Sequence, residues 1–172
     1  ARDEERMAAV ERACDFVCNA TREPLMSPDP AVYKGGYDVR GWGHCYGLRF
    51  LLALERTGSI PAGRESAVAE AITWYLQALE STEIPHAGGW NYARPAGRTK
   101  AAPASPFMTP PALEALFLAK SQGFAVDAAV VTRALDALER CRNKSGSVQY
   151  AGPAQNGRAE ATPGAVGRMC AT

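Results

Sequence analysis

The chain has 172 residues, enough for one domain with a sizeable core but few for two. Nineteen basic and eighteen acidic residues give a formal net charge of +1, so the composition gives no electrostatic support to a nucleic-acid partner. No uninterrupted apolar run approaches the ~18 residues of a membrane helix, so we expect a soluble protein without a transmembrane segment. These properties favour a single globular domain over residues 1–172.

The cysteines do not form a metal motif. They are spread along the chain at Cys14, Cys18, Cys45, Cys141 and Cys170, with no C-x-x-C pair. Because zinc needs about four ligands in close array, we expect no metal site, and nothing in the sequence implies another cofactor. We interpret the thiols as free, buried, small hydrophobic groups, which favours a reducing compartment such as the cytoplasm.

Hydrophobic periodicity predicts five helices in chain order. They cover residues 3–19, 42–56, 64–80, 109–121 and 127–142, and "TPGAVGRMCAT" begins a sixth in the style of the fourth. The first, third and fifth helices carry apolar side chains on one stripe, whereas the second and fourth are apolar nearly all round. We therefore expect two layers, in which the second, fourth and sixth helices are enclosed by the others.

Residue types at the helix ends predict where the helices begin and stop. Gly58 and Gly123 are placed to end the second and fourth helices. Thr109 is expected to cap the start of the fourth helix, with prolines in its first turn. Asp127 is expected to cap the fifth helix.

The predicted layers imply a specific core. The side chains expected to be buried together are Leu48, Leu51, Leu52, Leu113, Leu116 and Phe117. On the half-exposed helices, the inward stripe includes Met7 in the first helix and Leu135 in the fifth. Arg133, Asp136 and Glu139 are expected to face solvent.

The loops repeat as well as the helices. The segments "KGGYDVRGWG", "AGGWNYARPA" and "SGSVQYAGPA" each follow a half-exposed helix and precede an enclosed one. Three copies of a helix-pair unit with variable loops indicate a repeat array. We expect Tyr37, Trp90 and Val148 to be equivalent wedges between helical hairpins, with glycines that let the backbone pass close beneath. A ligand-stacking role for Trp90 is the alternative.

This alternation of helices, together with the G-G-W and S-V-Q-Y turns, resembles the prenyltransferase and squalene-cyclase repeat proteins. The resemblance covers essentially the whole chain and implies an all-α fold of the α/α toroid type, with concentric inner and outer helix layers. A complete toroid of that family has about twice as many helix pairs, so the chain corresponds to about half a toroid. We therefore expect a piece of a longer protein or a self-associating chain, whose partner is the rest of the toroid or a second copy.

The catalytic motifs of the family are absent from this sequence. The cyclases protonate their substrate with a D-x-D-D motif, whereas Asp29 stands alone between two prolines here. The protein prenyltransferases hold zinc with Asp, Cys and His, the Asp and Cys being two residues apart, and no D-x-C occurs here. The sequence therefore assigns neither chemistry.

The resemblance places the N-terminal ends of the inner helices at a central cavity, where free N–H groups suit polar or anionic ligands. The candidate catalytic residues at this rim are Asp38, His44 and Cys45, as an acid, a base and a soft ligand. The candidate binding residues are Arg40, Trp42, Tyr46, Trp90, Tyr92, Arg94, Met108 and Thr109, with Phe107 beside them. In the alternative interpretation, His44 and Cys45 are packed helix-start residues, and Asp38 bonds to Arg40 or to backbone.

Two functions stay open at this point. The missing motifs favour a binding or scaffold domain of a larger protein, with an apolar small molecule, a peptide or a glycan as its ligand. The alternative is a terpenoid cyclase or prenyltransferase-like enzyme acting on an isoprenoid or another extended apolar substrate, with aromatic rings stabilising cationic intermediates. The aromatic content of 8% argues against a dedicated cyclase.

Overall fold

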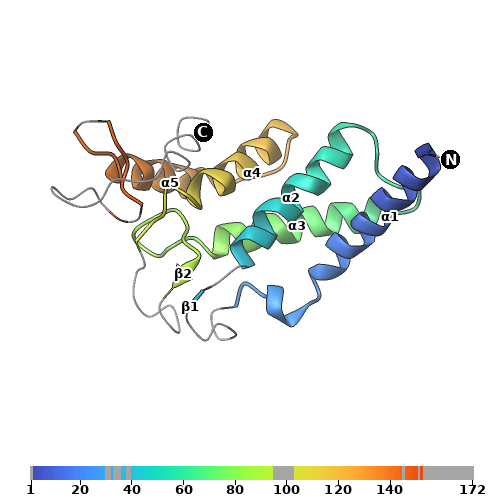
Figure 1. Cartoon of the computed structure of the whole chain (residues 1–172), viewed down its shortest axis with the longest axis horizontal. Helices are drawn as coiled ribbons and strands as arrows, with labels where there is room; N and C mark the ends of the chain where they lie inside the picture. Colours follow the sequence, from blue (N-terminus) through green and yellow to red (C-terminus); the bar gives the residue numbers. More distant parts are fainter. Residues whose placement is uncertain are drawn as a thin grey trace.

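The computed structural model describes residues 2–29, 32, 36–37, 40–94, 103–144, 146–150 and 152, and gives only the backbone for 36–37 and 93–94. Its α-helices are α1 (Arg2–Ala20), α2 (Arg40–Arg56), α3 (Glu65–Ser81), α4 (Thr109–Ser121) and α5 (Ala128–Arg140) (Figure 1). A short 3-10 helix, η1 (Pro24–Met26), follows α1. The predicted all-α class and the five predicted helices are confirmed. The expected sixth helix lies outside the described residues.

Extended backbone is scarce in the described part of the chain. The two-residue strands β1 (Gly36–Tyr37) and β2 (Ala93–Arg94) pair antiparallel, and one isolated bridge joins Arg142 to Val148. The β1–β2 pair connects the loop before α2 to the loop before α4, two of the loops that repeat in sequence. None of the described helices combines the length and the hydropathy that a bilayer-spanning segment needs.

Burial alternates along the chain in the predicted order. Tyr46 is the only exposed residue of α2 before Glu55, and in α4 only the last two residues are exposed. In contrast, α1, α3 and α5 each expose one side. Helix α2 contacts α1, α3, α4 and η1, while α4 contacts α5. In Figure 1, α1, α3 and α5 are spread along the long axis, and α2 and α4 run side by side, so α2 is the centre of the packing.

The predicted core is present. The leucines at 48, 51, 52, 113 and 116 have no exposed surface and belong to one cluster, against which Phe117 packs half-buried. The side chains of Arg133, Asp136 and Glu139 are exposed, as predicted. The apolar pattern that runs nearly all round α2 and α4 therefore identified the enclosed helices correctly.

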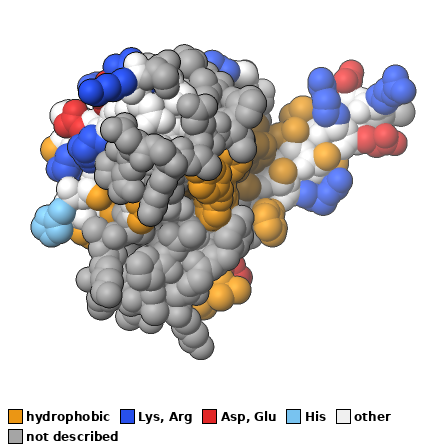
Figure 2. Space-filling model, turned by 60° about the vertical axis from the view of Figure 1, so that its left-hand side comes forward, with side chains coloured by type: hydrophobic (Ala, Val, Ile, Leu, Met, Phe, Trp, Pro, Cys, Tyr) orange, Lys and Arg blue, Asp and Glu red, His pale blue; other side chains and the backbone are white. Residues whose placement is uncertain are grey.

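Two residues assigned to inward stripes are in fact exposed. Leu135 lies beside the buried line of α5, which consists of Val130, Ala134 and Leu138 at helical spacing. Leu135 directly follows Ala134 and is therefore rotated about 100° from this line, which leaves its side chain exposed. Met7 is exposed because the N-terminal half of α1 projects from the molecule, and Cys14 is the only fully buried residue of that helix (Figure 2).

The enclosed helices α2 and α4 end in the same way. The amide of Ser59 donates to the Leu54 carbonyl at 2.8 Å, and the amide of Phe124 donates to the Ala119 carbonyl at 3.1 Å. In both helices this bond spans a glycine one residue past the C-cap, which is the Schellman arrangement. The predicted roles of Gly58 and Gly123 are confirmed, and the matched ends are a repeated feature of the fold.

One predicted N-cap is confirmed and the other is wrong. The Asp127 carboxylate accepts the amide of Ala129 at 2.7 Å and caps α5. The N-cap of α4 is Met108, and Thr109 is the first helical residue. The reason is that the Thr109 hydroxyl bonds to the Trp90 backbone in the preceding loop, so it does not serve an amide of its own helix.

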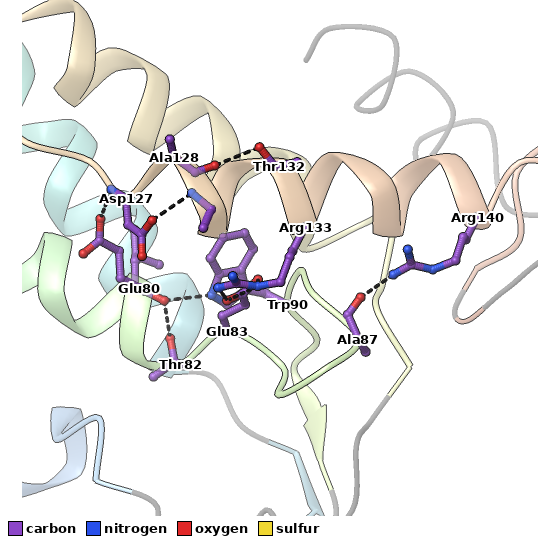
Figure 3. A network of polar contacts seen from close by, with 12 residues as sticks. Glu80, Thr82, Glu83, Ala87, Trp90, Asp127, Ala128, Thr132, Arg133 and Arg140 are labelled. Atoms are coloured by element: carbon purple, nitrogen blue, oxygen red, sulfur yellow. Dashed lines mark hydrogen bonds and ion pairs between the residues drawn. The ribbon is translucent and has the colours of Figure 1, made fainter.

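The Gly-Gly-Trp turn fills the space between α3, α4 and α5. Trp90 is fully buried, and its indole Nε1–H donates to the Leu79 carbonyl at 3.0 Å (Figure 3). A Cβ on Gly88 would lie 2.3 Å from the Arg133 carbonyl oxygen, and one on Gly89 would lie 2.8 Å from Thr109 Oγ1. The predicted wedge is therefore confirmed for Trp90. Val148 is also buried, whereas the side chain of Tyr37 lies outside the described residues.

Polar contacts hold α5 over this turn (Figure 3). The Arg133 guanidinium makes a two-pronged ion pair with the Glu83 carboxylate, with a shortest distance of 2.5 Å. At the start of α5, the amide of Asp127 donates to the Glu80 carboxylate at 2.8 Å. Arg140 donates to the Ala87 carbonyl within the turn. Together these contacts fix the orientation of α5 over the turn.

We predict that Gly88→Ala destabilises the protein by about 3 kcal/mol, since it combines a strained left-handed backbone with a clash against α5. Gly63→Ala is a matched control, because Gly63 has the same φ of +77° but nothing within 4 Å of the place where a Cβ would lie. We expect it to cost about 1 kcal/mol. Urea unfolding measures both values, and equal costs would show that the turn does not contact α5 closely.

Leu116→Ala is expected to lower the free energy of unfolding by about 2–5 kcal/mol, because it leaves a cavity in the fully buried core. Leu135→Ala makes the same chemical change on an exposed position of α5 and should cost less than about 1 kcal/mol. The same unfolding measurement applies. A cost below about 0.5 kcal/mol for Leu116→Ala would contradict the assignment of α4 to the core.

Candidate functional site

Five aromatic rings gather at the N-terminal ends of α2 and α4, and we call them the aromatic cluster. They are Trp42, Tyr46, Tyr92, Phe107 and Tyr150. The Trp42 ring stacks on Tyr46 with centroids 5.9 Å apart and meets Phe107 edge-on at 5.6 Å. Tyr92 and Tyr150 extend the cluster with centroid distances of 6.4 Å to their neighbours. Rings at these distances attract one another in offset or edge-to-face arrangements.

The cluster is packed on its inner side and open on its outer side. Trp42, Tyr92 and Phe107 are half-buried, whereas Tyr46 is 49% and Tyr150 43% exposed. The open ring faces offer a surface for apolar groups and for cations.

Local structure explains how these rings come together. Trp42 and Tyr46 lie four residues apart on α2 and therefore share one face of that helix. The loop before α4 is held in place by the amide of Phe107, which donates to Ser105 Oγ at 3.1 Å. The Asn91 side chain donates to the Pro103 carbonyl at 2.8 Å and fixes the backbone next to Tyr92.

A cavity of about 550 Å³ adjoins the cluster at Tyr46, and we call it the α1–α2 pocket. Its walls are the C-terminal half of α1, the η1 segment and the first turns of α2, with Tyr75 of α3 behind them. The lining is predominantly apolar, and two of its side chains, Phe16 and Leu25, are 75% and 79% exposed at the mouth. Both volume and lining match small-molecule sites in proteins.

Two glycines one turn apart, Gly43 and Gly47, form the floor of this pocket. A Cβ on Gly43 would lie 2.7 Å from Met26 Cε, and one on Gly47 would lie 2.8 Å from Tyr75 Cζ. The Tyr75 hydroxyl donates to the Val17 carbonyl at 2.9 Å, and burial raises the pKa of Tyr75 to about 12, so the hydroxyl stays protonated. The back of the pocket is therefore fixed by close packing and a hydrogen bond.

The two candidate catalytic residues that the structure describes, His44 and Cys45, do not line this pocket. His44 has no exposed surface, its ring Nε2–H donates to the Met26 carbonyl at 2.8 Å, and its ring meets Trp74 edge-on. Cys45 is fully buried, and burial raises its pKa to about 12, so the thiol is neutral at physiological pH. Asp38 lies outside the described residues. The placement of His44 and Cys45 agrees with the interpretation as packed helix-start residues.

The candidate binding residues divide into two groups. Trp42, Tyr46 and Tyr92 meet in the aromatic cluster, as their common position at the rim predicts. The others lie elsewhere: Trp90, Met108 and Thr109 are in the core, Arg40 donates to the Ser27 carbonyl at 2.8 Å, and the Arg94 side chain lies outside the described residues.

Sequence reasoning missed Tyr150 and the α1–α2 pocket. Tyr150 ends the S-V-Q-Y turn, so the loop repeat was a signal that its ring contacts Phe107, as the ring of Tyr92 does. The signal for the pocket was Gly43-x-x-x-Gly47, which leaves a flat strip on an otherwise bulky helix. Within the described ranges, no three His, Cys, Asp or Glu side chains gather as a metal site would require.

Comparisons of the chain with protein-family models, with curated proteins and with solved structures find no match. The resemblance to the prenyltransferase and squalene-cyclase repeat proteins therefore rests on the sequence motifs alone.

Thr109→Val is expected to destabilise the protein by about 1–3 kcal/mol, because it leaves the buried amide of Trp90 without its acceptor while preserving the side-chain shape. Thr132→Val removes a hydroxyl from an exposed position of α5 and should change the stability by less than about 0.5 kcal/mol. Chemical denaturation of both variants checks the difference. Equal stabilities would show that the Thr109 hydroxyl is not needed to hold the turn.

Proposed function

We propose that this chain is a helical-repeat binding domain that takes an extended apolar small molecule into the α1–α2 pocket. The observation that carries the proposal is the pocket itself: about 550 Å³ with a predominantly apolar lining, next to five aromatic rings. Small-molecule sites typically have volumes of roughly 300–1,000 Å³ and bury most of the ligand surface. A ligand longer than the pocket would continue over Tyr46 onto the aromatic cluster.

The exposed apolar side chains at the mouth supply a driving force. Phe16 and Leu25 are largely exposed, and a ligand between them would remove apolar surface of both from water. Each square ångström of apolar surface buried contributes about 25 cal/mol. The floor and back wall need no rearrangement, because Gly43, Gly47 and Tyr75 are already fixed. Preorganisation of this kind reduces the entropic cost of binding.

We further propose that the helices belong to an α/α toroid-type repeat, as the resemblance implies. Three features support this proposal: the alternation in burial, the matched ends of α2 and α4, and the β1–β2 pair between successive repeat loops. In this arrangement the chain supplies about half a toroid, and the rest of the toroid or a second copy of the chain completes it.

The alternative function, an isoprenoid-converting enzyme, has one observation in its favour. Stacked aromatic faces stabilise cations, and the aromatic cluster offers such faces at Tyr46 and Tyr150. Acid–base chemistry at the pocket would need a titratable group placed for it, and the charged side chain among its described lining residues, Glu23, is exposed at the mouth. His44 and Cys45 are buried in the core, which supports binding over catalysis.

We predict that the neutral fluorescent probe N-phenyl-1-naphthylamine binds the chain saturably and is displaced by farnesol. Ala20 lines the pocket, so Ala20→Trp should fill part of it and weaken probe binding by about tenfold or more. Ala69→Trp places the same indole on the exposed face of α3 and should leave binding unchanged. A fluorescence titration measures the dissociation constant of the probe for the unmodified chain and for both variants.

Thermal unfolding of each variant distinguishes a filled pocket from a damaged fold. If a folded Ala20→Trp protein binds the probe with unchanged affinity, the probe does not bind in the α1–α2 pocket. Absence of saturable binding by the unmodified chain would overturn the proposed function.

A further inference from the structure

We propose that the ligand of the α1–α2 pocket carries a cationic ammonium group beside its apolar body. This inference rests on the proposed function and adds the charge of the ligand to it. Three independent features of the pocket favour a positive charge at its mouth and disfavour a negative one.

The first feature is the charge of the lining. Among the described residues that line the pocket, Glu23 is the only one with a charged side chain, and Asn19 is a polar neighbour. Both are exposed at the mouth. Arg22 and Arg40 are near in sequence, but neither lines the pocket, and Arg40 donates to the Ser27 carbonyl. The described part of the lining therefore has one negative charge and no positive charge to balance it.

The second feature is the end of α1. This helix of 19 residues stops at Ala20, and both Asn19 and Ala20 lie in the pocket wall. The C-terminal end of a helix carries a partial negative charge, which is reduced here because the carbonyls of residues 17–20 all accept hydrogen bonds. No basic side chain in the last turn of α1 offsets it. The helix end and the Glu23 carboxylate therefore add their fields at the same side of the pocket.

The third feature is the aromatic surface around the mouth. Phe16 lies on the α1 side and Tyr46 on the α2 side, and both are substantially exposed. Trp42 stacks behind Tyr46 at a centroid distance of 5.9 Å. Ring faces attract ammonium groups by cation–π interaction and do not attract carboxylates. Figure 2 shows hydrophobic side chains along the projecting helix α1 and where it meets the rest of the molecule.

The test compares three probes of equal chain length that differ only in the head group: decylammonium, decan-1-ol and decanoate. Each competes with N-phenyl-1-naphthylamine at neutral pH and low salt, below its micelle concentration. We expect decylammonium to displace the probe about three- to fivefold more effectively than decan-1-ol, a difference typical of a partly exposed charge pair. Decanoate should be the weakest competitor. Added salt should reduce the preference for ammonium, because it screens the charges at the mouth.

Glu23→Gln keeps the shape of the side chain and removes its charge, so the ratio of ammonium to alcohol affinity should fall toward one. Glu55→Gln is the matched control, since Glu55 is exposed at the end of α2 and does not line the pocket. This variant should keep the ratio of the unmodified chain.

The outcomes separate the two proposals. If decan-1-ol displaces the probe and decylammonium is no better, or decanoate is best, the cationic preference is wrong while the apolar pocket stands. If Glu23→Gln keeps the full preference, Glu23 is not its source and the assignment is overturned. If none of the three displaces the probe, the proposed function fails with it.

Discussion

Two hydrogen bonds between the Thr109 hydroxyl and the Trp90 backbone join the loop before α4 to the first turn of that helix. They satisfy the buried hydroxyl group of Thr109, which would otherwise be costly to bury. They also hold the Trp90 backbone against α4, so that the indole ring enters between α3, α4 and α5. The indole N–H then bonds to the last turns of α3 at Leu79. Helix α2 packs on both α3 and α4. The position of Trp90 between α3 and α4 therefore affects the spacing of the enclosed helices and the placement of the aromatic rings at their N-terminal ends.

Much of the fold was predictable from local sequence, because the relevant forces act within one helix turn or one loop. Apolar side chains nearly all round identified α2 and α4 as the enclosed helices, and glycines located two helix ends. The errors at Leu135 and Met7 have a different origin. Whether an apolar residue on a stripe is covered depends on how far a neighbouring helix extends and how closely it approaches, and neither quantity is contained in the period of one segment.

Part of the candidate site was also predictable from local sequence. Trp42 and Tyr46 share a helix face, and Tyr92 follows a repeated turn, so their proximity follows from the repeat. Prediction of the α1–α2 pocket would have required the position of η1, whose Met26 lies on Gly43, and the hydrogen bond from Tyr75 to Val17. These contacts join segments far apart in sequence. The residue type of Thr109 predicts a helix cap, but its hydroxyl donates to the Trp90 carbonyl in the preceding loop.

Helix α1 is attached to the rest of the molecule by few interactions. Cys14 is its only fully buried residue, and its other connections include the pair between Asp15 and Arg64 and the bond from Tyr75 to Val17. An element with so little buried surface opens locally at a lower free energy than the core does. Any molecule held between α1 and α2 has α1 as one of its walls, so occupancy and the docking of α1 are linked thermodynamically, and each favours the other. The projecting helix is thus the part of this chain whose motion would report what the pocket contains.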